Sequence, residues 1–296
     1  MEFYYKIANQ KFRLKSDTPL IENLDSSLFR DEISEEPDIN CEVKFVEELP
    51  DVQGSRLGQA LDTRLYQTKE GMYLETFHKE DKQGMILSYL PKSTQEMVQI
   101  WALKKHMPHT ARLQVLWSAM DLPYQLLKKN VLTLHSSVVE INGGVIIFFA
   151  PSGVGKSTQA ALWERYRGAK QLNGDKTGIS SENNRTIAYG LPFCGTSKIC
   201  TNFSLPVRGM VLLSQAEENK ISRLTGLTAL KAVMDNCFGH PSMEGCMEQM
   251  IEITSKILEN VPIYALACTP DENAVICLEE QLRKDNRYDN FVQSVD

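Results

Sequence analysis

An apolar run that leads into a glycine-rich loop most constrains how this chain can fold. Residues 144–149 read GVIIFF, the loop APSGVGKS covers 150–157, and TQAALWERY follows directly. A short apolar run bounded by turn residues predicts a buried strand, whereas the Ala, Leu and Glu content of the following stretch predicts a helix. Glycines let the chain curl tightly between the two elements. A strand that passes through such a loop into a helix is typical of α/β domains.

The loop matches the Walker A pattern G-x-x-x-x-G-K-[ST] of P-loop proteins, with Ala150 at its first position. Small residues allow successive backbone N–H groups to point at an anion, and the N-terminus of the helix adds a partial positive charge. We therefore predict a nucleotide-binding loop. ATP is the expected nucleotide, and a loop that contacts only phosphates leaves the choice between ATP and GTP open. Lys156 would reach the β- and γ-phosphates, and the Ser157 hydroxyl would bind Mg²⁺. The predicted nucleotide-binding residues are Ser152, Gly153, Val154, Gly155, Lys156, Ser157 and Thr158. The alternative interpretation is a plain glycine turn with a helix N-cap at Ser157.

Phosphoryl transfer also requires an acidic residue that holds the metal or accepts a proton from the attacking hydroxyl group. Asp175 in LNGDK lies eighteen residues after Ser157, at the end of a stretch where a second strand would emerge beside the loop. We predict that Asp175 is the proton acceptor and a magnesium ligand. The composition Asn-Gly-Asp also fits an ordinary turn, which is the alternative interpretation.

The first 108 residues differ from the rest in being rich in strand signals. Short runs with partial alternation and many aromatic or β-branched residues are separated by polar turns, which predicts an antiparallel meander. These runs are EFYYKIA, KFRLK, CEVKFVE, DTRLYQT, GMYLETF and GMILSYL. We expect an N-terminal antiparallel β-rich domain over 1–108 and a catalytic α/β domain over 109–296.

Around this boundary the pattern changes to helical periodicity. Ser93 and Glu96 have capping-box spacing, which predicts a helix over 93–107, and a second helical stretch over 110–130 should break near Pro123. Asn142 and Gly143 then predict a hairpin turn between strands at 131–141 and 145–150. Further strands are expected at 185–193, 207–215 and 261–269, and further helices near 227–238, 243–260 and 271–284.

Composition and charge exclude several classes of protein. The net charge of −6 and the absence of a basic stripe argue against a nucleic-acid partner. No apolar run approaches the roughly 18 residues of a membrane span, and the first residues lack the layout of a secretion signal, so we expect a cytoplasmic protein without a membrane partner. Seven cysteines without CxxC pairs predict buried small side chains, with neither disulfides nor a zinc site.

The stretch LHSSVVEINGGVIIFFAPSGVGKST resembles the catalytic domain of HPr kinase/phosphorylase and its relatives, a P-loop kinase group akin to phosphoenolpyruvate carboxykinase. The resemblance covers about residues 131–270, and it is carried by a histidine, a hairpin and a loop that reads S-G-V-G-K-S. His135 precedes Ala150 by fifteen residues, as in the family. LNGDK stands where the family has an acidic motif, and GLPFCGTSK (190–198) looks like a loop that relatives place near the phosphates. The implied fold is a mixed-sheet P-loop kinase domain of the HPr kinase and carboxykinase type.

The resemblance also implies roles for individual residues. It places His135 beside the active site, where the imidazole would touch the phosphoryl group or orient the acid, although a lone histidine on an apolar strand is more often structural. It suggests Lys198 and Asn202 for the acceptor side. The family usually has two adjacent aspartates, and here the pair is Gly174 and Asp175. A single carboxylate argues against the reverse phosphorylase reaction and leaves open whether Asp175 is base, metal ligand or both.

The predicted function is that of a kinase, a transferase that moves the γ-phosphoryl group of ATP to a hydroxyl group of a protein, peptide or free amino acid, with serine as the first candidate. HPr itself is not implied as the substrate, because residues 1–108 show no likeness to the regulatory domain of the bifunctional enzymes. The alternative is an ATP-binding regulatory or scaffold protein that transfers nothing. Carboxykinase chemistry is disfavoured, since the residues for a second metal and for carboxylate binding are not found. The resemblance leaves assembly as a homo-oligomer open.

Overall fold

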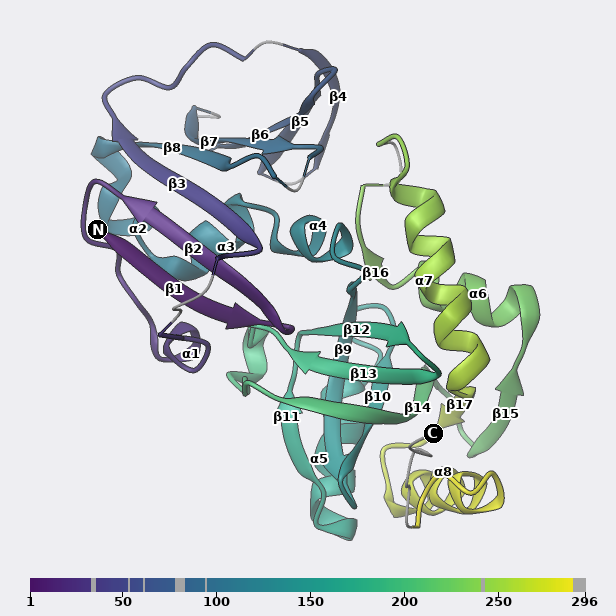
Figure 1. The fold of residues 1–296 in the computed structure, drawn as a ribbon. Coiled ribbons are helices and arrows are strands. Elements are labelled where there is room, and N and C mark those ends of the chain that lie inside the picture. The colour runs from purple at the N-terminus through teal and green to yellow at the C-terminus, as the bar shows by residue number, and fades with distance from the viewer. Residues whose placement is uncertain are drawn as a thin grey trace. The chain divides into compact units, whose positions relative to one another are not determined.

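The structure is a computed structural model, and it describes residues 1–32, 36–52, 54–60, 62–77, 83–93, 95–240 and 243–289. The chain divides into two compact units, Met1–Lys129 and Asn130–Asp296, and each is built on one large sheet with helices (Figure 1). The protein is therefore mixed α/β. The first unit extends to Lys129 instead of ending at residue 108. The reason is that Trp117 packs edge-on against Tyr5 and Phe12 and donates a hydrogen bond to Ser26 Oγ, which ties the helices after residue 108 to the first strands.

The sheet of the first unit has eight strands, and most neighbours are antiparallel. In spatial order the strands are β1 (Glu2–Ile7), β2 (Gln10–Ser16), β3 (Ile39–Val46), β8 (Val98–Leu103), β7 (Gly84–Pro91), β6 (Gly71–Phe77), β5 (Thr63–Gln67) and β4 (Ser55–Ala60). The pairs β2–β3 and β3–β8 are parallel, so the expected purely antiparallel meander is wrong. Long connections before and after β3 let the chain return to the same end of the sheet, which a parallel pair requires.

The helix predicted over 93–107 is also wrong, because strand β8 occupies its centre. Val98, Ile100 and Ala102 alternate with more exposed neighbours and are almost completely buried between β3 and β7. Sheet pairing therefore overrides the capping signal. Only short helical turns follow, η1 (Lys104–His106) and α2 (Met107–Thr110).

The predicted break in the second helical stretch is confirmed. The chain forms α1 (Leu24–Ser27) early in the first unit and ends that unit with two short helices, α3 (Leu113–Ala119) and α4 (Leu122–Leu127). Asp121 adopts a left-handed φ of 49° between α3 and α4, and its carboxylate accepts a hydrogen bond from the backbone N–H of Tyr124. Pro123 lies in the first turn of α4, where a proline lacks no helical hydrogen bond.

The sheet of the second unit closes on itself, because β10 pairs with both β9 and β14. The ring runs β10–β9–β12–β13–β14 and back to β10. The strands are β9 (Leu132–Ile141), β10 (Gly144–Phe149), β11 (Lys170–Asn173), β12 (Lys176–Glu182), β13 (Arg185–Gly190), β14 (Ser204–Gln215), β15 (Lys220–Leu224), β16 (Cys237–Phe238) and β17 (Ile263–Cys268). Strands β10, β14 and β17 are parallel neighbours, so their carboxyl ends meet at one edge. The predicted hairpin between β9 and β10 is confirmed, with positive φ at Asn142 and Gly143.

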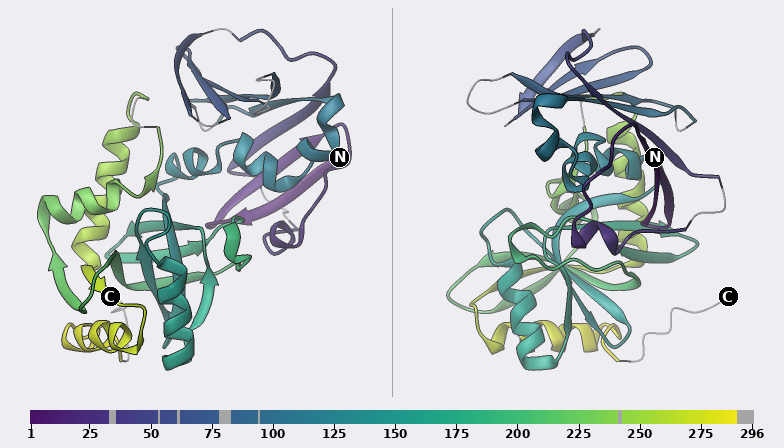
Figure 2. Two further views of the ribbon diagram at one scale, coloured as in Figure 1. Left: turned by 180° about the vertical axis from the view of Figure 1, so that it is seen from behind. Right: turned by 90° about the vertical axis from the view of Figure 1, so that its left-hand side faces the viewer.

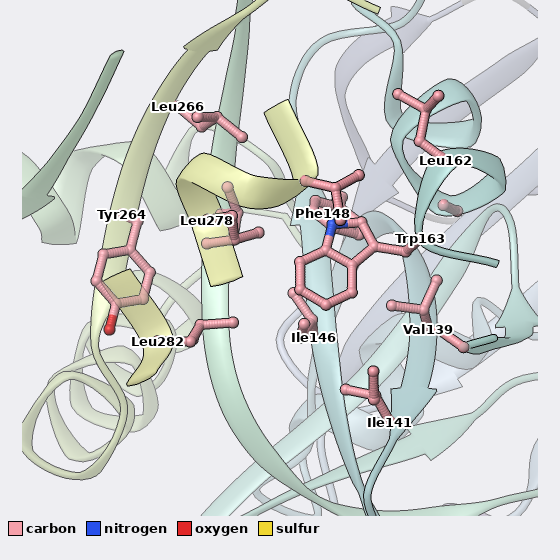
Figure 3. Close-up of a cluster of buried hydrophobic side chains, with 14 of the residues drawn as sticks. Val139, Ile141, Ile146, Phe148, Leu162, Trp163, Tyr264, Leu266, Leu278 and Leu282 are labelled. Atoms are coloured by element: carbon pink, nitrogen blue, oxygen red, sulfur yellow. The ribbon is translucent and has the colours of Figure 1, made fainter. Parts of the chain in front are cut away.

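Four helices complete this unit at the predicted places, and a shared core holds two of them to the sheet. They are α5 (Lys156–Arg167), α6 (Gly226–Met234), α7 (Cys246–Asn260) and α8 (Glu272–Lys284). Helices α5 and α8 contact each other and lie side by side in both views of Figure 2. Trp163 of α5 and Leu278 of α8 are fully buried with Phe148 of β10 (Figure 3). This core positions the start of α5 at the carboxyl end of β10.

Within the described residues no helix is long and apolar enough to cross a membrane. Four of the seven cysteines are buried, as the sequence predicts, and the other three are half-buried.

Candidate functional site

The loop between β10 and α5 has the curled backbone that its glycines predict. Gly153 has a φ of +82° and Gly155 a φ of +121°, which side-chain-bearing residues rarely adopt. A Cβ atom at either position would meet nothing within 4 Å, so backbone conformation, not crowding, requires the two glycines. The alternative N-cap at Ser157 is wrong, because α5 begins at Lys156 with Gly155 as its cap and no side-chain capping bond. The first N–H groups of α5 therefore have no side-chain cap, as at anion-binding helix ends.

Lys156 lies folded against its own loop. Its side chain is 6% exposed, and Nζ donates hydrogen bonds to the carbonyl oxygens of Ala150 at 2.8 Å and Pro151 at 3.2 Å. Burial lowers the pKa of Lys156 below the usual lysine value, and the Asp175 carboxylate acts in the opposite direction. Within the part of the chain that the structure describes, Lys156 forms no ion pair. No carboxylate of these residues therefore neutralises the ammonium group at contact distance.

Asp175 lies in the tight connection between β11 and β12. Asn173, 1% exposed, holds this connection: its Oδ1 accepts hydrogen bonds from the backbone N–H groups of Asp175 at 2.8 Å and Lys176 at 3.1 Å. Gly174 lies so close to Ser197 that a Cβ atom there would be 2.1 Å from the Ser197 hydroxyl oxygen. A side chain at position 174 would therefore have to displace Ser197.

His135 on β9 contacts the same connection. Its Nδ1 lies 3.0 Å from the backbone oxygen and 3.5 Å from a carboxylate oxygen of Asp175, and the backbone N–H of Ser136 donates to that backbone oxygen at 3.0 Å. The ring edge of Phe238 packs against the imidazole, with 6.2 Å between centroids. His135 therefore contacts both the backbone and the carboxylate of Asp175.

The predicted residues meet in one hollow of about 510 Å³, which we call the loop hollow. Its lining is His135, Ser152, Gly153, Gly155, Lys156, Ser157, Thr158, Gly174, Asp175, Gly195 and Thr196. Every predicted catalytic and metal-binding residue belongs to it. Val154, predicted for nucleotide binding, does not line it, and neither do Lys198 and Asn202, suggested for the acceptor side. A loop with a positive end and a carboxylate therefore face one open space.

Sequence reasoning placed the segment 190–198 near the phosphates, but it assigned no role to Gln215. Gly195 and Thr196 come from η2 (Gly195–Ser197), and a Cβ atom on Gly195 would lie 3.0 Å from Cβ of Asp175. Gln215 ends β14, and its amide nitrogen lies 3.3 Å from the carbonyl oxygen of Val154. The signal for Gln215 was the expected strand 207–215, because parallel neighbours end at the same edge of a sheet.

The loop hollow fits a magnesium ion that is held mainly by phosphate and water. Among the described residues, no three His, Cys, Asp or Glu side chains are close enough together to hold a metal by themselves. Mg²⁺ usually takes only one or two protein oxygens and completes its shell with water and substrate phosphates. The exposed Ser157 hydroxyl and the Asp175 carboxylate in one hollow match that requirement.

Comparisons with known proteins find a distant structural similarity. No protein-family model matches the sequence, and no curated protein matches it. The structure of the Hpr(Ser) kinase/phosphatase from Coxiella burnetii is similar with a TM-score of 0.32 and 15% sequence identity, over 52% of this chain and 90% of that chain. At this level of similarity we infer the function from the residues of the chain itself.

Proposed function

We propose that the second unit, Asn130–Asp296, is a kinase that transfers the γ-phosphoryl group of ATP to a hydroxyl group of a protein, peptide or free amino acid. The observation that carries the proposal is that Lys156, Ser157 and Asp175 line one hollow at the end of a glycine loop. A glycine turn that only connects a strand to a helix needs neither a carboxylate opposite it nor a buried ammonium group. Phosphoryl transfer needs both, since its catalysis is mostly positioning and charge stabilisation.

In this proposal the loop and Lys156 stabilise the charge that spreads over the phosphoryl oxygens. The backbone N–H groups at the start of α5 and the ammonium group supply the positive potential. The hydrogen bonds from Nζ to two loop carbonyls can be exchanged for phosphate oxygens by rotation of a flexible side chain. Bound Mg²⁺, held by Ser157 and Asp175 directly or through water, would neutralise phosphate charge.

Asp175 is proposed as the proton acceptor for the attacking hydroxyl group. The acceptor oxygen forms a bond to the γ-phosphorus, the bond from that phosphorus to the bridging oxygen breaks, and ADP leaves with the electron pair. The hydroxyl proton passes to the Asp175 carboxylate. His135 and the turn made by Asn173 hold that carboxylate in place.

The test is transfer of label from γ-labelled ATP, with Mg²⁺, to free serine and to serine-containing peptides and proteins. We expect Asp175→Asn to slow transfer by about 10²- to 10⁴-fold, the usual contribution of a positioned base, while ATP still binds. Asp235→Asn is the matched control, because Asp235 is an exposed aspartate of the same unit. Equal rates for wild type and Asp175→Asn would contradict the assigned role.

One observation favours a second function, an ATP-binding regulator or scaffold without transfer. Among the described residues, Asp175 is the only acidic residue in the lining of the loop hollow. A scaffold would bind ATP with Mg²⁺ yet label no hydroxyl acceptor, and Asp175→Asn would then change nothing except metal affinity. The labelling experiment therefore separates the two functions.

A further inference from the structure

A second hollow of about 360 Å³ also borders the first turn of α5, and we call it the side hollow. Gly155 and Thr158 line both the loop hollow and the side hollow. The two hollows therefore adjoin at these two residues, which places the side hollow next to the predicted phosphate loop.

The walls of the side hollow are largely apolar. Val154, Leu213, Cys268 and Pro270 contribute apolar or weakly polar surface. The volume falls within the range of small-molecule sites, and such sites combine apolar walls with a few polar groups that fix orientation. A flat, mostly apolar ring system suits these walls better than a charged group does.

Gln159 supplies an unpaired polar group in this wall. Its side chain is 3% exposed, and its Oε1 is a buried acceptor without a hydrogen-bond partner in the described structure. Its Nε2 donates only to the sulfur of Cys268 at 3.2 Å, and sulfur is a weak acceptor. Buried amide oxygens are nearly always hydrogen-bonded, so a turn of the Gln159 amide toward a donor in the side hollow would satisfy this one.

We infer that the side hollow binds the nucleoside of the nucleotide and that the Gln159 amide reads the 6-position of a purine. This inference rests on the proposed function, because the phosphates must occupy the loop. Adenine presents an amino donor at position 6, whereas guanine and hypoxanthine present an acceptor oxygen there. An unpaired Oε1 therefore selects adenine.

Calorimetric titration of the full chain with Mg²⁺ and four ligands tests the inference: ATP, GTP, inosine triphosphate and inorganic tripolyphosphate. We expect ATP to bind at least about tenfold more tightly than the other three. Tripolyphosphate leaves the side hollow empty, whereas GTP and inosine triphosphate fill it but present an acceptor oxygen to Oε1. Gln159→Leu keeps the shape but removes the amide. It should lower the affinity for ATP to that for inosine triphosphate and leave tripolyphosphate binding unchanged.

A second variant fills the side hollow from its exposed rim, so that the test stands even where Gln159→Leu does not fold. Ala216 is exposed and lines the side hollow, and Ala216→Phe should reduce ATP affinity about tenfold or more without affecting tripolyphosphate. Glu217→Phe is the matched control, since Glu217 is exposed next to it and outside the lining.

The outcomes separate the inference from the proposed function. Equal affinity for ATP and tripolyphosphate, with no effect of Ala216→Phe, would overturn the nucleoside site and leave the phosphate loop intact. Tighter binding of ATP than tripolyphosphate, but equal affinity for ATP, GTP and inosine triphosphate, would overturn the role of Gln159. Absence of binding by all four ligands would overturn the proposed function together with this inference.

Discussion

Two buried cations of the second unit, Lys156 and Arg208, are held by backbone carbonyl groups at opposite ends of β10. Lys156 donates to Ala150 and Pro151 after the end of the strand. Arg208, 1% exposed, donates to the carbonyl oxygens of Arg287 at 2.9 Å and Tyr288 at 3.0 Å and to that of Asn142 before the strand begins. Burial lowers the pKa of both side chains.

The difference between the two lies in what surrounds them. The surroundings of Arg208 are filled: a Cβ atom on Gly144 would lie 2.6 Å from its Nε. The planar guanidinium group of Arg208 donates hydrogen bonds to carbonyl groups of two chain segments. It thereby joins the hairpin between β9 and β10 to the segment after α8. Lys156 instead borders the loop hollow, and its single ammonium group can rotate toward a ligand. The same type of interaction is therefore structural at one end of β10 and available for binding at the other.

The largest effect should come from Lys156→Met. We expect phosphoryl transfer to fall by about 10²- to 10³-fold, the usual loss when a group that stabilises developing charge is removed. The melting temperature should not fall, because a buried charge is replaced by an apolar chain of similar length. Label transfer and thermal unfolding measure the two effects, with the exposed Lys170→Met as control. A large loss of stability in Lys156→Met would show that Lys156, like Arg208, has a structural role.

Arg208→Met should lower stability and leave ATP binding unchanged. Three carbonyl groups each lose a hydrogen bond, so the free energy of unfolding should fall by about 2–4 kcal/mol, while the folded protein still binds ATP. Urea denaturation and calorimetry measure these two quantities. Arg223→Met is the control, since that side chain is 56% exposed. If ATP affinity dropped and stability did not, the contrast between the two ends of β10 would fail.

The smallest effect concerns pH. In the folded state burial lowers the pKa of Lys156, whereas the unfolded chain has the ordinary value of 10.5. Between these two values the unfolded state binds more protons, so the stability contribution of Lys156 rises with pH. Wild type should therefore gain stability relative to Lys156→Met between neutral pH and about pH 10. Urea denaturation of both proteins at the two pH values measures the change, and a decrease would contradict burial as the cause.

Local sequence patterns predicted the glycine loop and α5 much better than they predicted the strands of the first unit. The φ values of Gly153 and Gly155 and the caps of the helices depend on neighbouring residues, so the loop and α5 could be foreseen. Strand β8 could not, because residues 98–103 alternate in a way that also fits a helix with a capping box, and only pairing with β3 and β7 decides between them. The parallel pairs of β3 depend on contacts over long sequence separations, which no local pattern contains.

The sequence by itself determined the strand, glycine loop and helix over 144–167, because these follow from side-chain types and backbone preferences of adjacent residues. Tertiary structure alone decided that His135 contacts Asp175, that Gly174 is closed by Ser197, and that Gln159 has an unpaired oxygen in the side hollow. The physical reason is that closure of the β ring brings together residues far apart in the chain. Their distances depend on packing of the whole unit and not on any segment of it.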